Sequence, residues 1–276
     1  MKMKLFILLA IVFSFTHLHA QEFITKAVIE YEVKSNIQKT IRGGGFMDML
    51  KDQLPRFKTG YYDFTFANNK SVYKFDHWNE ESRKIPDWFK KDDEQNVWYY
   101  NYTTDTYNNQ KSIWGSNINV EDSIPKIQWR ITNDNRVIAG FNCRKAVAVI
   151  FDSVYVFAFY TDEIMIPGGP CSLHGLPGMI LGVTIPRLYT SWIATKVIVN
   201  NVDESIIKPV SSKKNYRLSF LKKAISDNLD DWNPDDDEGK QQDSPTPGDF
   251  ALGGLFYRAE IRFVFARNGM GEAICE

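Results

Sequence analysis

A thiol and an imidazole lie three residues apart near the middle of the chain, as Cys171 and His174. Both side chains bind zinc and copper, so the pair could form half of a metal site, with Met165 and Met179 adding soft sulfur and His77 a further ligand. Alternatively, the pair could act as nucleophile and base in a secreted hydrolase or transferase. The sequence contains no nucleophile elbow or other catalytic signature. We therefore favour a structural role, with copper or zinc as the alternative and no cofactor firmly implied.

The loop that carries this pair is rich in glycine and proline. Residues 166–178 read I-P-G-G-P-C-S-L-H-G-L-P-G, which indicates an irregular but stiff backbone. Residues 176–179 fit a type II turn, with Pro177 in the second position and Gly178 in the third. An apolar strand is expected over residues 179–185. The loop should therefore deliver this strand into the core at a fixed angle.

Residues 175–180 read G-L-P-G-M-I and resemble the motif that names the GLPGLI family of exported bacterial proteins. Methionine replaces the leucine of that motif, a change that keeps apolar volume. The resemblance extends to residues 141–146, 159–164 and 185–192, so that its core covers about 135–200. The structural residues of the motif are Gly175, Leu176, Pro177 and Gly178.

The resemblance implies export and a mostly antiparallel, curved β domain. It implies no reaction, because this family brings no catalytic residues that could be carried over to the chain. A similar domain is associated with the non-catalytic N-terminal part of some secreted glycan-processing enzymes. A function taken from that association rests on analogy, because a fold does not fix a function.

Aromatic side chains are concentrated between residues 57 and 107. Such residues commonly form a β core, but some could face a ligand and stack on a sugar or a lipid. Trp78, Trp88 and Trp98 have hydrophilic sequence neighbours, which suggests partial exposure. We therefore select these three tryptophans as candidate ligand-binding residues.

Alternating and apolar segments predict a mostly β fold, a curved antiparallel sheet or an open barrel or bowl with one or two short helices. Asn68 and Asn69 predict a tight hairpin between residues 61–66 and 71–75. Further strands are expected at 26–33, 97–102, 106–114, 126–131, 136–141 and 189–199. Residues 146–151 and 154–160 predict a hairpin whose strands are apolar on both faces and hence covered on both sides. Short helices are expected at 46–54 and 218–229.

The first twenty residues have the pattern of a secretory signal peptide. Two lysines precede an apolar run over residues 5–15, and Ala20 stands at the expected cleavage site. The run is too short for a membrane-spanning helix, which needs about 20 apolar residues, and no later segment approaches that length. We expect an exported protein, periplasmic or extracellular. Cys143 and Cys171 would then meet an oxidising compartment, where they are candidates for a disulfide, while Cys275 stands next to the chain end.

The chain is expected to contain one β-rich domain, residues 21–229, after the signal peptide at 1–20. Residues 230–249 form an acidic segment that we predict to be a disordered linker. Residues 250–276 are expected to form a C-terminal strand and tail.

The balance of charge excludes one large class of function. The chain has 33 Lys and Arg against 34 Asp and Glu, without the basic excess of a nucleic-acid-binding protein. The sequence thus favours an exported envelope protein that binds an unknown ligand or envelope partner without catalysing a reaction. A copper- or zinc-binding envelope protein is the alternative, and a secreted hydrolase comes third.

Overall fold

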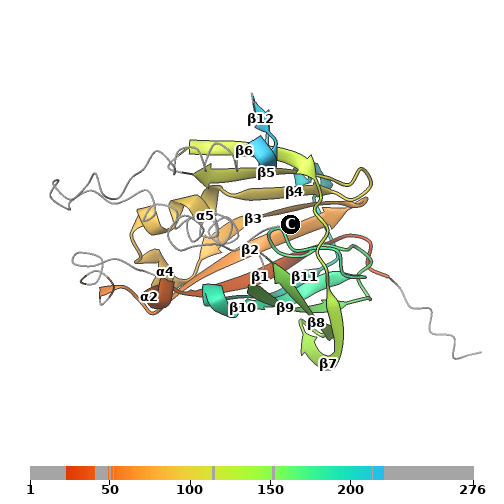
Figure 1. Cartoon of the computed structure of the whole chain (residues 1–276), viewed down its shortest axis with the longest axis horizontal. Coiled ribbons are helices and arrows are strands. Elements are labelled where there is room, and N and C mark those ends of the chain that lie inside the picture. The colour runs from red at the N-terminus through yellow and green to blue at the C-terminus, as the bar shows by residue number, and fades with distance from the viewer. Residues whose placement is uncertain are drawn as a thin grey trace, which may run out of the picture.

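The computed structural model describes residues 23–220, except 41–48, 50, 52, 114–115, 151–152 and 213. Within this part, the chain forms one open sheet of twelve strands, strongly twisted along its length (Figure 1). The strand order is β12-β6-β5-β4-β3-β2-β1-β11-β10-β9-β8-β7. Neighbouring strands are antiparallel, except for β12, which pairs parallel to β6. The predicted mostly β, curved and open fold is confirmed.

The twelve strands of the described residues have the following bounds. The strands are β1 (Ala27–Asn36), β2 (Phe57–Ala67), β3 (Lys70–Trp78), β4 (Val97–Asn101), β5 (Thr106–Ile113), β6 (Ser116–Ser123), β7 (Arg130–Ile138), β8 (Phe141–Ile150), β9 (Val154–Thr161), β10 (Met179–Ile185), β11 (Thr190–Ile198) and β12 (Asn215–Tyr216).

The helical elements of the described part are short. They are α2 (Ile37–Thr40), α4 (Glu80–Arg83), α5 (Lys91–Gln95), η1 (Asp87–Phe89), η2 (Pro186–Leu188) and η3 (Glu204–Ile206), and the η elements are 3₁₀ turns. None of the helices in the described residues is long and apolar enough to span a membrane. The predicted signal peptide, acidic linker and C-terminal strand lie outside the described residues. The same holds for most of the predicted helices at 46–54 and 218–229.

The hairpin between β2 and β3 forms as predicted. Asn68 and Asn69 both adopt positive φ angles, 51° and 57°, which the primed two-residue turns require. Strand β6 was not predicted. Its sequence is mostly polar, and Ile118 and Val120 are its only large apolar residues. The expected strands at 126–131 and 136–141 are also misplaced, because β7 ends at Ile138 and the chain turns before β8 begins.

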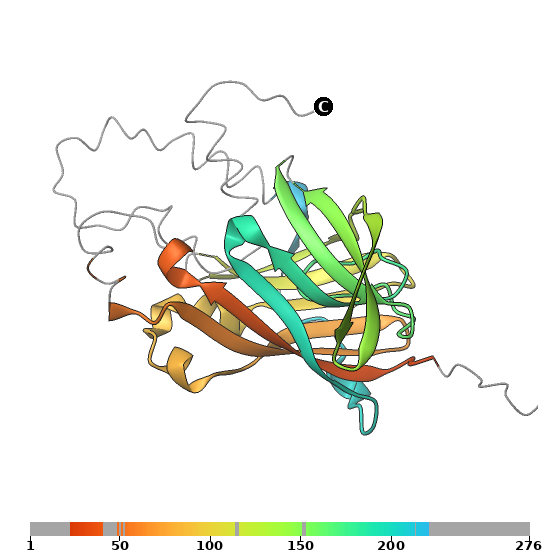
Figure 2. The ribbon, with the colours of Figure 1, turned by 90° about the horizontal axis from the view of Figure 1, so that it is seen from below.

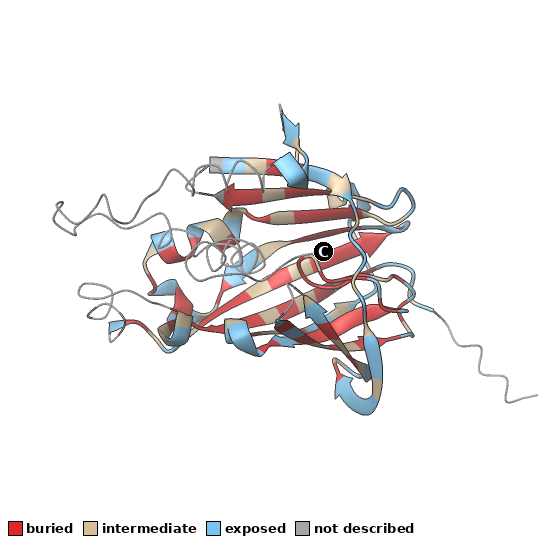
Figure 3. Cartoon of the chain, viewed as in Figure 1, coloured by how far each residue is buried: buried red, intermediate tan, exposed pale blue. Residues whose placement is uncertain are grey.

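The strands β8 and β9 are not covered on both sides, which corrects the sequence prediction. Their burial alternates, with small residues such as Ala146 and Ala158 facing the core. Val149 and Tyr155 lie opposite one another on the other face and are exposed. Figure 3 shows buried and exposed positions following one another along the strands of the sheet. An apolar residue at an outward position of a strand does not by itself mean that another layer covers it.

One hydrophobic core joins the two halves of the sheet. The strands β8 to β10 lie at a steep angle to β2 to β5 in Figure 2, so that the sheet has a hollow face. Tyr31, Phe64 and Tyr73 from the first half and Trp192 from the second belong to this core. The segment between β9 and β10 packs into it as well and is therefore central to the candidate site.

Candidate functional site

The loop between β9 and β10 is held in place by its own backbone. Gly175 N donates to the carbonyl oxygen of Pro167 at 3.0 Å, and Ile180 N donates to that of Gly168 at 2.9 Å. Met179 N donates to the carbonyl oxygen of Ile164. The residue Ile164 also forms a parallel β-bridge with Ile24, which precedes β1. These bonds fold the loop back on itself, as expected of a stiff segment rich in glycine and proline.

The turn at the end of this loop is tighter than predicted. Gly178 N donates to the carbonyl oxygen of Leu176 at 2.8 Å, which closes a three-residue turn around Pro177. Gly178 itself has a φ of 139°, a conformation that residues with a side chain rarely adopt. The turn therefore differs from the predicted type II turn, although proline and glycine occupy the expected places.

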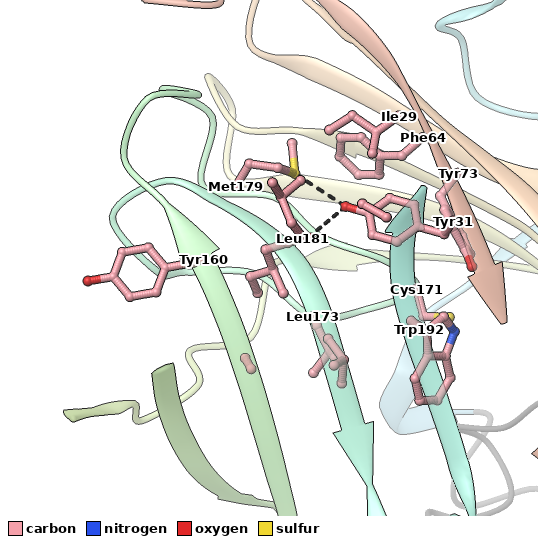
Figure 4. Packing of buried hydrophobic residues seen from close by; sticks show 14 of the residues in the cluster. Ile29, Tyr31, Phe64, Tyr73, Tyr160, Cys171, Leu173, Met179, Leu181 and Trp192 are labelled. Carbon is pink, nitrogen blue, oxygen red and sulfur yellow. Dashed lines mark hydrogen bonds between the residues drawn. The ribbon is translucent and has the colours of Figure 1, made fainter. Parts of the chain in front are cut away.

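The apolar side chains of the loop are buried against the inner face of the sheet. The group consists of Ile164, Ile166, Leu173 and Leu176, which share one core with aromatic residues of β1 to β5. Figure 4 shows Leu173 and Cys171 of the loop in this packing. Glycine is required where the loop backbone meets these aromatics. A Cβ on Gly168 would stand 2.8 Å from both Phe64 Cζ and the Tyr102 hydroxyl. The loop is thus an integral part of the core.

Cys171 lies inside this packing and has lost the character of a reactive thiol. Burial raises its pKa to about 12, and the interactions with Lys111, Tyr73 and Trp192 that favour the thiolate are smaller. Nucleophiles and metal ligands act as the thiolate, so Cys171 is protonated at neutral pH.

The predicted disulfide between Cys143 and Cys171 is not formed, because both thiols are free. Cys143 lies on β8, where its sulfur donates to the carbonyl oxygen of Phe141 at 3.6 Å, and burial raises its pKa to about 11. Cys171 lies in the loop, close to Tyr73 and Trp192. The prediction was wrong because Cys171 faces the aromatic core while Cys143 bonds to its own turn.

His174 is also buried, at 4% exposure, beside the Tyr100 ring at a centroid distance of 5.8 Å. Burial lowers its pKa to about 4, so the imidazole is neutral at physiological pH. Its backbone carbonyl accepts a hydrogen bond from Trp129 Nε1 at 2.9 Å, while its own Nε2 has no hydrogen-bond partner within the described part.

The candidate metal ligands are therefore not gathered into a complete set. No three His, Cys, Asp or Glu residues of the described part come together in a way that could hold a metal ion. Met165 is exposed, whereas Met179 is fully buried, with its sulfur 3.7 Å from the Tyr31 hydroxyl. His77 lies on β3, where it bonds to Asp76 and stacks on Tyr61.

The three candidate tryptophans differ sharply in exposure. Trp78 and Trp98 are 7% and 4% exposed, which contradicts the prediction, whereas Trp88 is 55% exposed, as predicted. Trp88 stacks on Phe89 with ring centroids 3.9 Å apart. Of the three, only Trp88 presents an indole face to solvent.

Two of these tryptophans are buried because they hold secondary structure together. Trp78 lies against Gly60, where a Cβ would stand 2.8 Å from Cζ3 of the indole, and its Nε1 donates to Glu94 at 2.6 Å. Trp98 packs against Tyr73 and lies 3.9 Å from the Lys111 ammonium. Both indoles are thus structural, and the polar neighbour His77 of Trp78 belongs to the other face of the strand.

A buried ion pair that the sequence analysis missed fixes α5 against the sheet. Lys58 of β2 pairs with Asp93 of α5, and its ammonium also donates to the carbonyl oxygen of Phe89. Lys58 lies over the Trp78 ring as well. A lysine within an alternating strand gave the only sequence signal, and the partner on a helix 35 residues later could not be identified.

A tyrosine that the analysis did not single out connects the sheet to the motif. The Tyr31 hydroxyl donates to the carbonyl oxygen of Ile180 at 2.6 Å (Figure 4). The two residues lie on β1 and β10, which are separated in the sheet by β11. The inward register of Tyr31 was predictable from alternation in β1, but its partner was not.

A family model and two solved structures show similarity to this chain. Residues 78–219, just over half of the chain, match the family model described as N-glycanase peptide, N-terminal domain. No curated protein matches the chain. Two solved structures are similar, titled "Structure of PNGF-II in C2 space group" and "Structure of PNGF-II in P21 space group", with TM-scores of 0.48 and 0.47 and 14% and 15% identity.

The chain spans only part of those proteins. The alignments cover 72% and 71% of this chain but 32% of each solved chain. The matched residues 78–219 include the loop with Cys171 and His174. They also include all strands that follow β3 in the chain, β4 to β12. The chain therefore belongs to the family of N-glycanase peptide N-terminal domains.

Proposed function

We propose that the protein is an exported binding or accessory module that does not itself catalyse a reaction. One observation carries this proposal: the loop with the most reactive side chains is used to build the core. Cys171 is held as a thiol and His174 as a neutral imidazole, both buried. A nucleophile and its base must reach a substrate, so these two residues serve stability rather than turnover.

The family supports a ligand class for this module. The description of the family names an N-glycanase, and the family model represents an N-terminal domain. We propose that the protein binds glycan-bearing polypeptides and leaves cleavage of the glycan to another protein or domain. The exposed indole of Trp88 offers a flat apolar face of the kind on which sugar rings stack.

The export route is part of the same proposal. The signal-peptide pattern at residues 1–20 and the resemblance to the GLPGLI family support secretion to the periplasm or the exterior. Expression of the full chain with its own leader checks this point. A secreted product that begins at Gln21 is expected, and a chain retained in the cytoplasm at full length would contradict it.

The binding test compares a glycopeptide with the same peptide after its glycan has been removed. The secreted protein should bind the glycosylated form more tightly, and Trp88→Ala should weaken that binding by about tenfold, the usual size of a stacking contact. Tyr155→Ala is the matched control, because Tyr155 is equally exposed but lies on β9. Equal binding to both peptides would reject the glycan ligand. Release of the glycan, abolished by Cys171→Ser, would reject the non-enzymatic role.

A metal-binding envelope protein is a second candidate, favoured by one observation. The buried Nε2 of His174 has no hydrogen-bond partner among the described residues, and a thiol lies three residues away. Native mass spectrometry of the protein, purified without chelator, tests this. A copper or zinc adduct that disappears in Cys171→Ser/His174→Ala would establish the second candidate. A bare mass after incubation with either metal would reject it.

A further inference from the structure

One end of the sheet gathers cations and aromatic rings that belong to neither candidate function. The end of β1 meets the start of β2, where Asn36 pairs with Phe57, and the start of β11, where Ser35 pairs with Thr190. The helix α2 and the 3₁₀ turn η2 both lie at this end (Figure 2). We call this end the basic–aromatic end. It is formed by the exposed Lys34, Lys39, Arg56, Arg187 and Tyr189 and by the half-buried ring of Phe57.

The cations of this end are held by rings. Lys39 Nζ lies 5.0 Å from the Tyr189 ring centroid, and the backbone N–H of Asn36 donates to the Tyr189 carbonyl oxygen. A second ring, that of Phe57 at the start of β2, also holds cations. Lys34 Nζ lies 4.6 Å from its centroid, and Arg56 Cζ lies 5.2 Å from it. A cation over an aromatic face keeps its full positive charge, in contrast to one that is neutralised by a carboxylate.

The fourth cation extends the patch toward β9. Arg187 of η2 is exposed and donates to the hydroxyl oxygen of Ser153 at 2.9 Å, a neutral partner. Within the described part, Lys34, Lys39, Arg56 and Arg187 form no ion pair. The basic–aromatic end therefore presents four charges that no described carboxylate pairs with.

Several carboxylates on the elements packed nearby have partners of their own, although Glu81 of α4 and Glu32 of β1 form no ion pair among the described residues. Glu32 of β1 accepts a hydrogen bond from the Tyr61 hydroxyl. On α4 and η1, Glu80 pairs with Arg83, and Asp87 pairs with Lys90. The charges of α4 and η1 thus largely cancel each other, whereas those of the basic–aromatic end add together.

Exposed apolar groups accompany these charges. Ile37 of α2 packs in a small core with Leu54, Ile85 and Phe89, so α2 contacts the segment before β2 and the turn η1. Trp88, Met49 and Tyr189 are all exposed on these connected elements. Aromatic and long apolar side chains beside unpaired lysine and arginine are characteristic of protein surfaces that lie on membranes.

We propose that the basic–aromatic end docks the protein on an anionic membrane surface. The four cations would meet lipid phosphates, while Tyr189 and Met49 enter the headgroup region. Charge complementarity and the exposed apolar groups together favour a lipid surface, because a soluble polyanion would have no use for the apolar groups. This inference goes beyond glycan binding and does not depend on it.

Vesicle flotation of the secreted protein tests the proposal. We expect binding to vesicles of phosphatidylcholine with phosphatidylglycerol, weaker binding at high salt, and none to phosphatidylcholine alone. The variant Lys39→Glu/Arg187→Glu should reduce the partition coefficient by at least about tenfold, since each basic group near an anionic surface contributes a several-fold factor. Lys70→Glu/Lys208→Glu is the control. It changes the net charge equally but lies near the β2–β3 turn and η3, and it should bind as the wild type does.

Five results would overturn the proposal. One is a wild type that does not bind anionic vesicles at low salt, and another is an equal loss in both double variants. The third is binding of a soluble acidic polysaccharide through Lys39 and Arg187 without vesicle binding. The fourth is vesicle binding that appears only after neutralising substitutions at residues 227–238. In that case the acidic stretch of the chain, and not a membrane, would be the ligand of the basic–aromatic end. Dimers that are lost in the Lys39→Glu/Arg187→Glu variant, without vesicle binding, would assign the end to a second copy.

Discussion

A Cβ atom on Gly178 would stand 2.1 Å from the carbonyl oxygen of Thr161, a contact far shorter than Cβ atoms show in proteins. The two residues face each other where β10 leaves the loop and pairs with the end of β9. The φ of Gly178 is 139°, so both the contact and the backbone conformation require glycine. The glycine of the motif thus lets the buried loop join the sheet directly.

Gly178→Ala should therefore be severely destabilising. We expect the free energy of unfolding to fall by roughly 3 kcal/mol or more, because strand pairing must shift to make room for the methyl group. Gly140→Ala is the matched control. Gly140 has a φ of 88° but no atom near the site of a Cβ, so only the backbone penalty of about 1–2 kcal/mol applies. Urea denaturation measures both, and equal losses would show that the contact with Thr161 is unimportant.

The tryptophans make a second, opposite pair of predictions. Trp98→Ala removes a buried indole and should lower the free energy of unfolding by about 3–5 kcal/mol. Trp88→Ala removes an exposed indole and should change it by about 0.5 kcal/mol or less. Thermal denaturation of the two variants separates these outcomes. A large loss for Trp88→Ala would mean that its stacking on Phe89 is part of the core.

These tryptophans also show where sequence reasoning fails. Side chains alternate between the two faces of a strand, so the polar His77 reports on the face opposite Trp78 and not on the burial of Trp78. The strand patterns of the sequence nevertheless located β1, β4 and β10 correctly. The strand positions could be predicted because they depend on local sequence, whereas the side of the sheet that becomes covered depends on distant segments.

The candidate site was predictable to a similar degree. Its stiffness follows from the glycines and prolines of residues 166–178 alone. Its burial does not, since it depends on Tyr31 and Tyr73, which precede the loop by about a hundred residues or more. The predicted metal and disulfide roles of Cys171 took the chemistry of the residue into account but not its surroundings. Burial among aromatic rings decides its protonation state.

Tyr31 provides a test of the contact between β1 and the motif. Tyr31→Phe keeps the ring but removes the hydroxyl that donates to the Ile180 carbonyl oxygen at 2.6 Å. The acceptor would be left buried without this donor, at a cost of about 1–3 kcal/mol in the free energy of unfolding. Tyr61→Phe is the control, since its hydroxyl bonds to Glu32 on a partly buried surface and its loss should cost less. A Tyr31→Phe protein as stable as the wild type would show that the bond contributes nothing.

His174 makes the stability of the protein depend on pH. Its pKa is lowered from 6.5 to about 4 by burial, so the folded chain binds fewer protons than the unfolded chain between these values. The free energy of unfolding should therefore fall as the pH is lowered from 6.5 to 4, by about 3 kcal/mol from this residue, and the contribution of His174 should not change further below that window. His174→Gln cannot take up the proton and should have a flatter profile between these pH values. Urea denaturation at a series of pH values measures both proteins. Parallel profiles for the wild type and His174→Gln would mean that the buried imidazole is not the source of the pH dependence.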